Sequence, residues 1–334
     1  MLKINYEKIA IVGAGPAGAF LASLLSREEI NVDVYEKSRK LGCYCAWGTV
    51  ESELKGFLRK VGLNIKDYVL SKIKRVIVNG IEVKVSNLIT FNKPKLISDL
   101  LKGVKVTWAE ASREIVGKYD LVVDATGWRR SLLPSLKNDF LMPTIEYVVK
   151  TKDLDENTVY IRFGKVGYAW LFPISNNYWH LGAGDTVLDP LFLVKKLVKE
   201  IGLKTRILCF CKGIIRLKPP MYSRPIKHGN IVGCGESIGT VFPVTGEGII
   251  PSMKSALMLF NVLANNRSLN EYEHAIVKEF RWLNQLFEIA YSLTGSGLKL
   301  VWILVKNYKS IFRYARRLGA ASLINIIKAL SKLL

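Results

Sequence analysis

The chain of 334 residues has few cysteines, a single glutamine and no long apolar run, and these shortages exclude several classes of protein. Its five cysteines form no disulfide framework of a secreted protein, and neither Cys-x-Cys pair has zinc-ribbon spacing. A transmembrane helix requires roughly 18 apolar residues, whereas the run "LVWILV" at 300–305 stops at Lys306. The N-terminus lacks a signal-peptide layout. We therefore expect a cytoplasmic protein without a metal site, and the single glutamine suggests a thermophilic source.

Acidic residues are also scarce. The 28 acidic residues face 49 basic ones, which leaves a net charge of +21 and favours a polyanionic partner. No acidic residue follows Glu288, and the basic residues beyond it alternate with apolar ones. This pattern fits a helix on a membrane surface and equally a solvated helix face. No RNA- or DNA-binding motif accompanies the charge, so we expect no nucleic acid partner.

The N-terminal segment "KIAIVGAGPAGAFLASLL" has the pattern of a dinucleotide-binding loop. An apolar strand at 8–12 leads into the G-x-G-x-x-G motif, and a helix follows. The next strand, "NVDVYEK" at 31–37, ends in a glutamate 18 residues past the last glycine, where an acid accepts hydrogen bonds from a ribose. The expected cofactor contacts are Gly13, Gly15, Pro16, Ala17, Gly18, Glu36 and Lys37.

Two later segments favour FAD over NAD(P). "KYDLVVDATGWRRS" at 118–131 and the glycine-containing segment at 229–260 resemble the A-T-G and G-D motifs of FAD enzymes of the glutathione-reductase superclass. Glutamate stands where that superclass usually has aspartate. There is no second G-x-G-x-x-G in the sequence, so the reductant has to come from an external electron donor. The resemblance implies FAD contacts at Ala125, Gly127, Gly235, Glu236, Gly246, Gly248 and Ile249.

The stretch "GYAWLFP" at 167–173 places three aromatic side chains at the period of a strand. It lies in "TVYIRFGKVGYAWLFPISNNYWHLGAGD", which predicts an antiparallel meander with a turn at the two asparagines. The stretch resembles the P-x-x-Y-x-W-x-F-P motif of the geranylgeranyl reductase family, with Lys165 in place of the first proline. "FPVTGEGI" at 242–249 and "CYCAWG" at 43–48 resemble further family motifs beside the flavin. The latter implies cofactor contacts at Cys45, Ala46 and Gly48, and Lys93 stands where the family has an arginine.

The resemblance implies an FAD-dependent oxidoreductase that saturates C=C bonds of isoprenoid lipids. Apolar area must supply the affinity for such a chain, at roughly 25 cal/mol per Å². The expected substrate wall is Trp47, Tyr168, Trp170, Phe172 and Phe242. The expected proton donors are Cys45 and Tyr168, whereas His180 is expected to be structural. A flavin monooxygenase or halogenase, and a non-catalytic electron carrier or lipid binder, remain alternatives.

The predicted architecture is α/β, with an FAD-binding Rossmann-type domain, an inserted antiparallel sheet and a helical C-terminal region. We expect a discontinuous FAD domain at 1–50, 90–130 and 222–265, an accessory insert with a hairpin at 51–89, a substrate sheet at 131–221 and a basic helical region at 266–334. The expected partners of this monomer are an isoprenoid lipid, an acidic ferredoxin as electron donor, and a membrane surface touched by the C-terminal helices.

Overall fold

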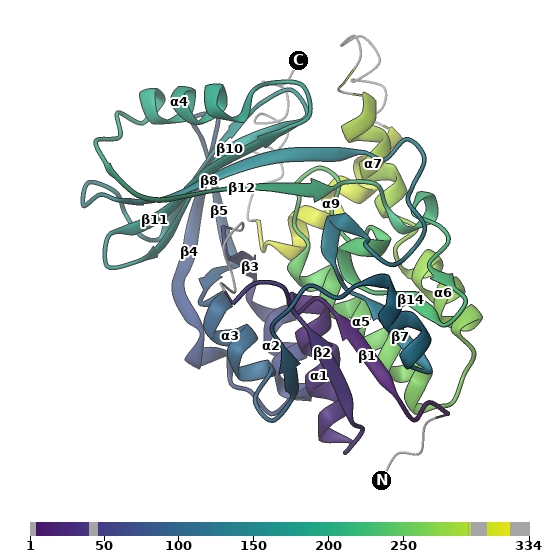
Figure 1. Cartoon of the computed structure of the whole chain (residues 1–334). Coiled ribbons are helices and arrows are strands. Elements are labelled where there is room, and N and C mark those ends of the chain that lie inside the picture. The colour runs from purple at the N-terminus through teal and green to yellow at the C-terminus, as the bar shows by residue number, and fades with distance from the viewer. Residues whose placement is uncertain (1–4, 40–45, 293, 295–305, 321–334) are drawn as a thin grey trace.

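The computed structural model describes residues 5–39, 46–292, 294 and 306–320, which form two sheets with helices packed around them (Figure 1). The first sheet collects strands that lie far apart in the sequence, in the order β13-β14-β7-β1-β2-β6. All neighbours in it are parallel except β13 and β14. The strands are β1 (Ile9–Val12), β2 (Val32–Tyr35), β6 (Lys105–Thr107), β7 (Leu121–Asp124), β13 (Lys227–His228) and β14 (Ile231–Gly233).

Helices cover this first sheet because its central strands, β1 and β7, are buried on both faces. Helix α1 (Pro16–Arg27) packs against α5 (Ile249–Ala264) and α3 (Lys93–Leu100). The remaining helices are α2 (Glu51–Lys60), α4 (Pro190–Glu200), α6 (Leu269–Glu279), α7 (Leu283–Ser292) and α9 (Tyr308–Arg317). Short 3₁₀ helices are η1 (Ile65–Asp67), η2 (Arg113–Lys118), η3 (Gly127–Arg129), η4 (Pro220–Tyr222) and η5 (Gly235–Ile238).

The second sheet is larger and has the order β12-β8-β11-β10-β9-β4-β5-β3. Its strands are β3 (Gly48–Val50), β4 (Val69–Val78), β5 (Ile81–Phe91), β8 (Leu141–Lys150), β9 (Thr158–Phe163), β10 (Gly167–Ser175), β11 (Tyr178–Asp185) and β12 (Arg206–Arg216). The predicted meander is confirmed, since β9, β10 and β11 are successive antiparallel neighbours. Asn176 and Asn177 form its turn with φ angles of 54° and 65°.

The hairpin of the expected accessory insert joins the same sheet as the expected substrate strands. Strand β4 pairs with β9 in parallel, whereas the other neighbours in this sheet are antiparallel. The sheet therefore continues from β9 through β4 and β5 to β3. In the sequence, β3 begins at the end of the 43–48 stretch that is expected beside the flavin. The domain boundaries themselves stay a prediction.

The two faces of the second sheet have different neighbours. Leu171 and Leu181 lie on the face that α4 covers, together with Leu193 of that helix. Tyr168, Trp170 and Phe172 alternate with that face along β10, so they point away from α4. These three side chains, the aromatic stripe, therefore face the segments 46–48 and 242–248.

The predicted fold class is confirmed: a Rossmann-type domain with a parallel sheet, an antiparallel sheet and a helical C-terminal region. Residues 295–305 and 321–334 of the expected basic region lie outside the described residues. None of the helices in the described ranges combines the length and the apolar character that a bilayer span needs.

Candidate functional site

The phosphate loop lies between β1 and α1 and leaves an open cradle. Gly13 has a φ angle of +100°, and its amide donates to the Tyr35 carbonyl at 2.8 Å. A Cβ at Gly18 would lie 1.9 Å from the Gly13 carbonyl oxygen, so the helix can approach the strand only at a glycine. A Cβ at Gly15 would have no heavy atom of the described residues within 4 Å. The space beside Gly15 and the helix N-terminus fit a pyrophosphate.

The first turn of α1 adds to this fit. Pro16 occupies the start of the helix, and no side chain in the described part of the chain caps it. Its free amides and the positive end of the helix dipole suit an anion. Ala17 is buried and Lys37 is exposed. The structure thus brings the predicted loop residues together at the carboxyl end of β1.

Glu36 lies beside this loop at the end of β2. Its carboxylate accepts from the Ala14 amide at 2.8 Å and from the Ser38 amide at 2.9 Å. Each oxygen keeps a further lone pair. The carboxylate is therefore held in place and retains the capacity to accept from ribose hydroxyl groups.

A buried aspartate that the sequence interpretation missed fixes the A-T-G segment. Asp124 ends β7, and its Oδ1 accepts from the Thr126 amide at 3.1 Å. Its Oδ2 accepts from the Leu132 and Leu133 amides, both at 2.9 Å. An acid at the end of an all-apolar strand was the available signal for this role. Asp124 thereby sets the course of the backbone past Ala125 and Gly127.

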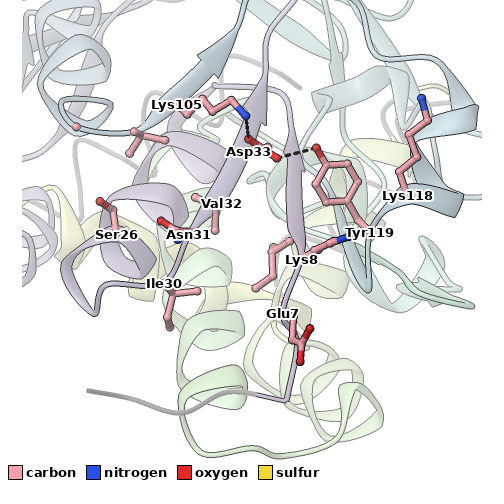
Figure 2. A pocket seen from close by; sticks show the side chains of 13 residues that line it. Glu7, Lys8, Ser26, Ile30, Asn31, Val32, Asp33, Lys105, Lys118 and Tyr119 are labelled. Carbon is pink, nitrogen blue, oxygen red and sulfur yellow. Dashed lines mark hydrogen bonds and ion pairs between the residues drawn. The ribbon is translucent and has the colours of Figure 1, made fainter.

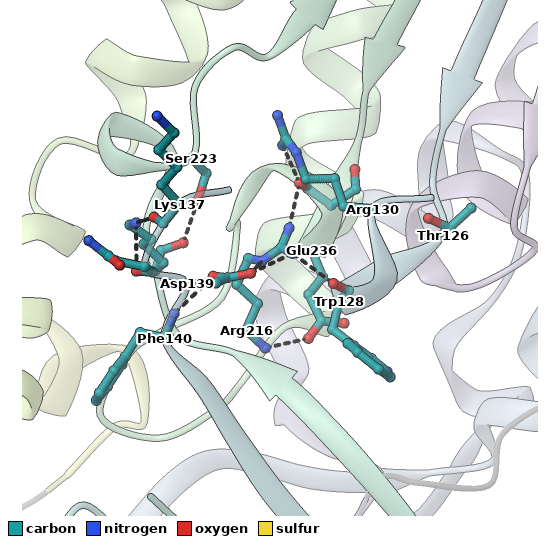
Figure 3. Close-up of polar contacts among 12 residues, drawn as sticks. Thr126, Trp128, Arg130, Lys137, Asp139, Phe140, Arg216, Ser223 and Glu236 are labelled. Carbon is teal, nitrogen blue, oxygen red and sulfur yellow. Dashed lines mark hydrogen bonds and ion pairs between the residues drawn. The ribbon is translucent and has the colours of Figure 1, made fainter. Parts of the chain in front are cut away.

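Glu236 follows β14 and lies against the A-T-G segment (Figure 3). Its Oε1 accepts from the Arg216 amide at 2.8 Å, and a Cβ at Gly127 would lie 3.1 Å from its Oε2. Burial raises the pKa of Glu236, while the positive charges of Arg216 and Lys93 oppose that rise. The structure therefore brings Glu236, Gly127 and Gly235 together, with the Lys93 charge acting on Glu236.

Two buried arginines lock these turns in place (Figure 3). Arg130 and Arg216 both donate to the Ser237 carbonyl, at 2.6 and 2.9 Å. Arg216 also donates to the Trp128 carbonyl at 2.7 Å and pairs with Asp139 at 2.8 Å. Burial, and then the charge of Arg216, lower the pKa of Arg130 to about 10. The sequence interpretation missed this pair because its members are 86 positions apart and match no local motif.

The aromatic stripe faces two expected flavin segments. The Tyr168 hydroxyl donates to the Thr245 carbonyl, next to Gly246. A Cβ at Gly48 would lie 2.5 Å from the Phe172 ring, so only glycine allows this approach. Trp170 lies 5.5 Å from the Tyr168 ring and is 7% exposed. The stripe therefore contacts the 46–48 segment and the 242–248 loop at once.

Trp47 and a buried titratable pair lie on the same face of the sheet. The Trp47 ring is 4.5 Å from the His180 ring, and His180 stands opposite Phe172 in the strand register. His180 Nδ1 contacts Glu146 Oε1, and the side chains are 5% and 6% exposed. His180 Nε2 has no hydrogen-bond partner among the described residues. The sequence interpretation treated His180 as structural; alternation along the strand was the only signal that it shares a face with Phe172.

Phe242 lies apart from the stripe, beneath the C-terminal helices. Its ring is 5.2 Å from Trp282 and 5.3 Å from Tyr314, and it is 3% exposed. The loop that it begins leads to Gly248 and Ile249, where α5 starts and no side chain of the described residues caps it. This second free helix N-terminus fits the flavin end of the cofactor. Cys45, the other expected proton donor, lies outside the described residues, and Ala46 is partly buried.

Another cavity, of about 490 Å³, lies at the opposite end of the parallel sheet (Figure 2). Asp33 pairs there with Lys105 at 2.9 Å and accepts from the Tyr119 hydroxyl at 2.8 Å. These residues stand at or before the amino ends of β2, β6 and β7. Ligands of open parallel sheets bind at the carboxyl ends, so this cavity is separate from the candidate site.

Comparisons with known proteins agree with this geometry. Residues 11–67 match the family model of the NAD(P)-binding Rossmann-like domain. A digeranylgeranylglycerophospholipid reductase of Methanococcus vannielii is 26% identical, over 91% of this chain and 88% of that protein. A second such reductase, from Methanococcoides burtonii, is 23% identical over 79% and 76%.

Solved structures share the fold. A geranylgeranyl bacteriochlorophyll reductase-like protein from Thermoplasma acidophilum superimposes with a TM-score of 0.72 at 17% identity, over 98% of this chain and 96% of that one. A flavin-dependent halogenase from Xanthomonas campestris gives 0.68 at 14% identity, over 86% and 78%. The resemblance to geranylgeranyl reductases is thus confirmed as similarity, and FAD is borne out as the expected cofactor. The specific reaction is not decided by these likenesses.

Proposed function

We propose that this chain is an FAD-dependent oxidoreductase that reduces C=C bonds in the isoprenoid chains of membrane lipids or their precursors. The observation that carries the proposal is the aromatic stripe. Tyr168 and Phe172 contact the two segments expected on either side of the flavin, at Thr245 and Gly48. A polyprenyl chain offers no hydrogen-bonding groups, so an aromatic face next to the cofactor site is the kind of surface that binds it.

In this proposal the residues of the chain bind the lipid, orient it toward the flavin and exclude water. Reduced FAD, when bound, supplies a hydride to one alkene carbon. The other carbon needs a proton from the protein or from water. The Tyr168 hydroxyl donates to the Thr245 carbonyl, which holds the ring in place. Among the described residues, Tyr168 and the buried His180–Glu146 pair beside Trp47 are candidate proton sources, and the pair is favoured because His180 Nε2 is unpartnered there.

The electrons come from an external donor in this proposal. The net charge of +21 suits an acidic ferredoxin, and the basic C-terminal region suits peripheral contact with an anionic membrane. The similarity to two digeranylgeranylglycerophospholipid reductases supports a lipid substrate.

The test is direct. Purified enzyme, reduced chemically in the absence of oxygen, is incubated with geranylgeranyl lipids, and the products are analysed by mass spectrometry. We expect a gain of two mass units for each double bond reduced. Unchanged lipid from enzyme whose flavin is fully reduced would reject the proposal.

A flavin monooxygenase or halogenase is the second candidate, because the halogenase from Xanthomonas campestris has the same fold. Such an enzyme would consume oxygen rapidly in the presence of NADPH. The same preparation tested in an oxygen electrode separates the two candidates.

A further inference from the structure

A groove of about 750 Å³ runs between α2 and α9, outside the cofactor cradle. Helix α9 contributes four cations and Phe312 to its lining, α2 contributes Ser52 and Glu53, and β5 contributes Asn87. The four cations are Lys309, Arg313, Arg316 and Arg317. In the proposed function these side chains belong only to the basic region that suits a membrane surface, and they have no role at the cofactor site. Four cations along one groove raise the question of what neutralises them.

Internal carboxylates account for only one of the four. Arg317 pairs with Glu53 at 2.7 Å and with Glu247 at 3.2 Å. Lys309, Arg313 and Arg316 are exposed, and none forms an ion pair with a carboxylate of the described residues. The Arg313 guanidinium lies over the Trp282 ring at 4.5 Å, which fixes its position without cancelling its charge. The groove therefore carries an excess of positive charge.

The helix itself does not favour this arrangement. Lys309 and Arg313 are four positions apart, as are Arg313 and Arg317, and like charges at this spacing destabilise a helix. The helix dipole favours cations in the last turn, which explains Arg316 and Arg317. Lys309 stands in the first turn, where the dipole opposes a cation. An anion bound in the groove removes these repulsions.

The walls of the groove are held in place. The Asn87 side-chain amide donates to the Arg317 carbonyl at 2.9 Å and to the Ser52 hydroxyl at 2.8 Å. These bonds fix the end of α9 to β5 and α2. From the same helix, Tyr314 and Arg317 contact Glu247 and Phe242 of the loop before α5. Arg317 thus lines the groove and also contacts the loop at the expected flavin end of the site.

We propose that the groove binds the phosphate headgroup of a phosphorylated isoprenoid substrate. Arginine forks bind phosphate with paired, charge-assisted hydrogen bonds, and Lys309 adds a third cation. The inference rests on the proposed function for the isoprenoid part of the ligand, whereas the phosphate part rests on the groove alone.

The experiment compares two ligands that differ only in the phosphate. Geranylgeranyl diphosphate and geranylgeraniol are titrated by calorimetry into the full chain, its Arg313→Gln/Arg316→Gln variant and a control. The control, Lys195→Gln/Lys199→Gln, removes the same charge from exposed positions on α4. We expect the arginine variant to bind the diphosphate at least about tenfold more weakly and the alcohol unchanged. The control should bind both ligands like the unaltered chain.

Several outcomes would overturn the headgroup assignment. They are an equal loss in the control, an equal loss for the alcohol, or no loss at all. Inorganic phosphate that binds as tightly as the diphosphate would assign the groove to free phosphate. Binding to phosphatidylglycerol vesicles that depends on the two arginines, with unchanged binding of the soluble diphosphate, would assign it to a membrane surface.

Folding and function are separated in the same design. Melting temperatures check each variant, and Arg316→Gln alone serves if the double variant unfolds, because Arg313 also packs on Trp282. In turnover, the arginine variant should raise KM for the diphosphate and leave kcat unchanged. Arginine-dependent binding without any reduced product would contradict the proposed function and retain the groove. Reduced product with an unaltered KM in the variant would support the proposed function and contradict the assignment of the groove to the headgroup.

Discussion

Gly15 and Gly18 lie three positions apart in the phosphate loop and are needed for different physical reasons. A side chain at Gly18 would collide with the Gly13 carbonyl at 1.9 Å, which is an internal contact of the fold. A side chain at Gly15 would enter space that is free of other described atoms. The first glycine thus serves the ligand, and the second serves the packing of helix on strand.

This difference predicts opposite effects of the same substitution. Gly15→Ala should melt like the unaltered chain and bind FAD at least about tenfold more weakly, because the Cβ occupies the approach of the pyrophosphate. Gly18→Ala should lose on the order of 1–3 kcal/mol of stability. Melting curves and flavin titration of the two variants check this. Full FAD affinity in Gly15→Ala would contradict it.

The prediction for His180 concerns a single ring nitrogen, Nε2, of a buried side chain. His180→Gln keeps a polar group of similar size but cannot carry the proton. We expect single-turnover alkene reduction to slow by roughly 10²-fold, with FAD affinity unchanged. His274→Gln, at an exposed position of α6, is the matched control. An unaltered single-turnover rate in His180→Gln would leave Cys45 and Tyr168 as the proton donors.

At the scale of elements, Arg317 is one of the residues that join α9 to distant parts of the chain. The Arg317 side chain is 13% exposed and meets Glu53 and Glu247. Arg317→Met removes the cation and leaves the buried Glu247 without its charged partner, although the Tyr314 hydroxyl still donates to it. Breaking such a pair costs about 3 kcal/mol. Arg59→Met, at an exposed position of α2, should change stability by less than about 0.5 kcal/mol. Denaturant unfolding of both variants tests the difference, and equal values would contradict this role for Arg317.

Helix α3 makes a pH-dependent contact with Tyr68, which follows η1 and precedes β4. Asp99 accepts hydrogen bonds from Lys102, Lys95 and Tyr68, and the bond from Lys102 is the largest cause that lowers the pKa of Asp99 to about 2. A carboxyl with a depressed pKa stabilises the fold above its unfolded pKa, and that contribution is lost as the pH falls toward the folded pKa.

The stabilising contribution of Asp99 is therefore lost between about pH 4 and about pH 2. In thermal melts, the advantage of the unaltered chain over Asp99→Asn should be constant near pH 6. It should shrink by about one or two degrees across this pH range, because solvent screens this surface group. A difference that stays constant down to pH 2 would contradict the assignment.

Elements whose partners are near in sequence were predictable, and those joined over long distances were not. The glycine loop, Glu36 and the asparagine turn follow from local dihedral and spacing rules, so their positions agree with the structure. Arg317 and Glu53 are 264 positions apart, and no local pattern marks them as partners. The β4–β9 pairing is of the same kind, because parallel pairing leaves no turn signature. Phe242 matched a family motif, but its ring is covered by Trp282 and by α9, whose packing no local pattern indicates.

At the scale of the whole molecule, the excess of positive charge predicts how the electrons arrive. An acidic ferredoxin is attracted to a chain of net charge +21 over a Debye length of about 8 Å at physiological salt. Flavin reduction by such a donor should slow by roughly tenfold between 50 and 500 mM salt. Reduction by dithionite serves as the control and should change much less. Equal salt dependence of the two reactions would argue against electrostatic steering.

The discontinuous first sheet also sets the order in which a ribosome can complete the protein. Strand β1 ends at Val12, whereas β14 begins at Ile231. Strand β14 pairs with β7, which in turn pairs with β1. At roughly 5–20 residues per second, translation needs about 10 to 40 seconds to bridge that interval. During this time the phosphate loop of the nascent chain lacks β14 and α5, which complete its pocket. Cofactor loading is consequently a late event of biosynthesis, and a chain released early would be a substrate for cellular quality control before it could become a flavoprotein.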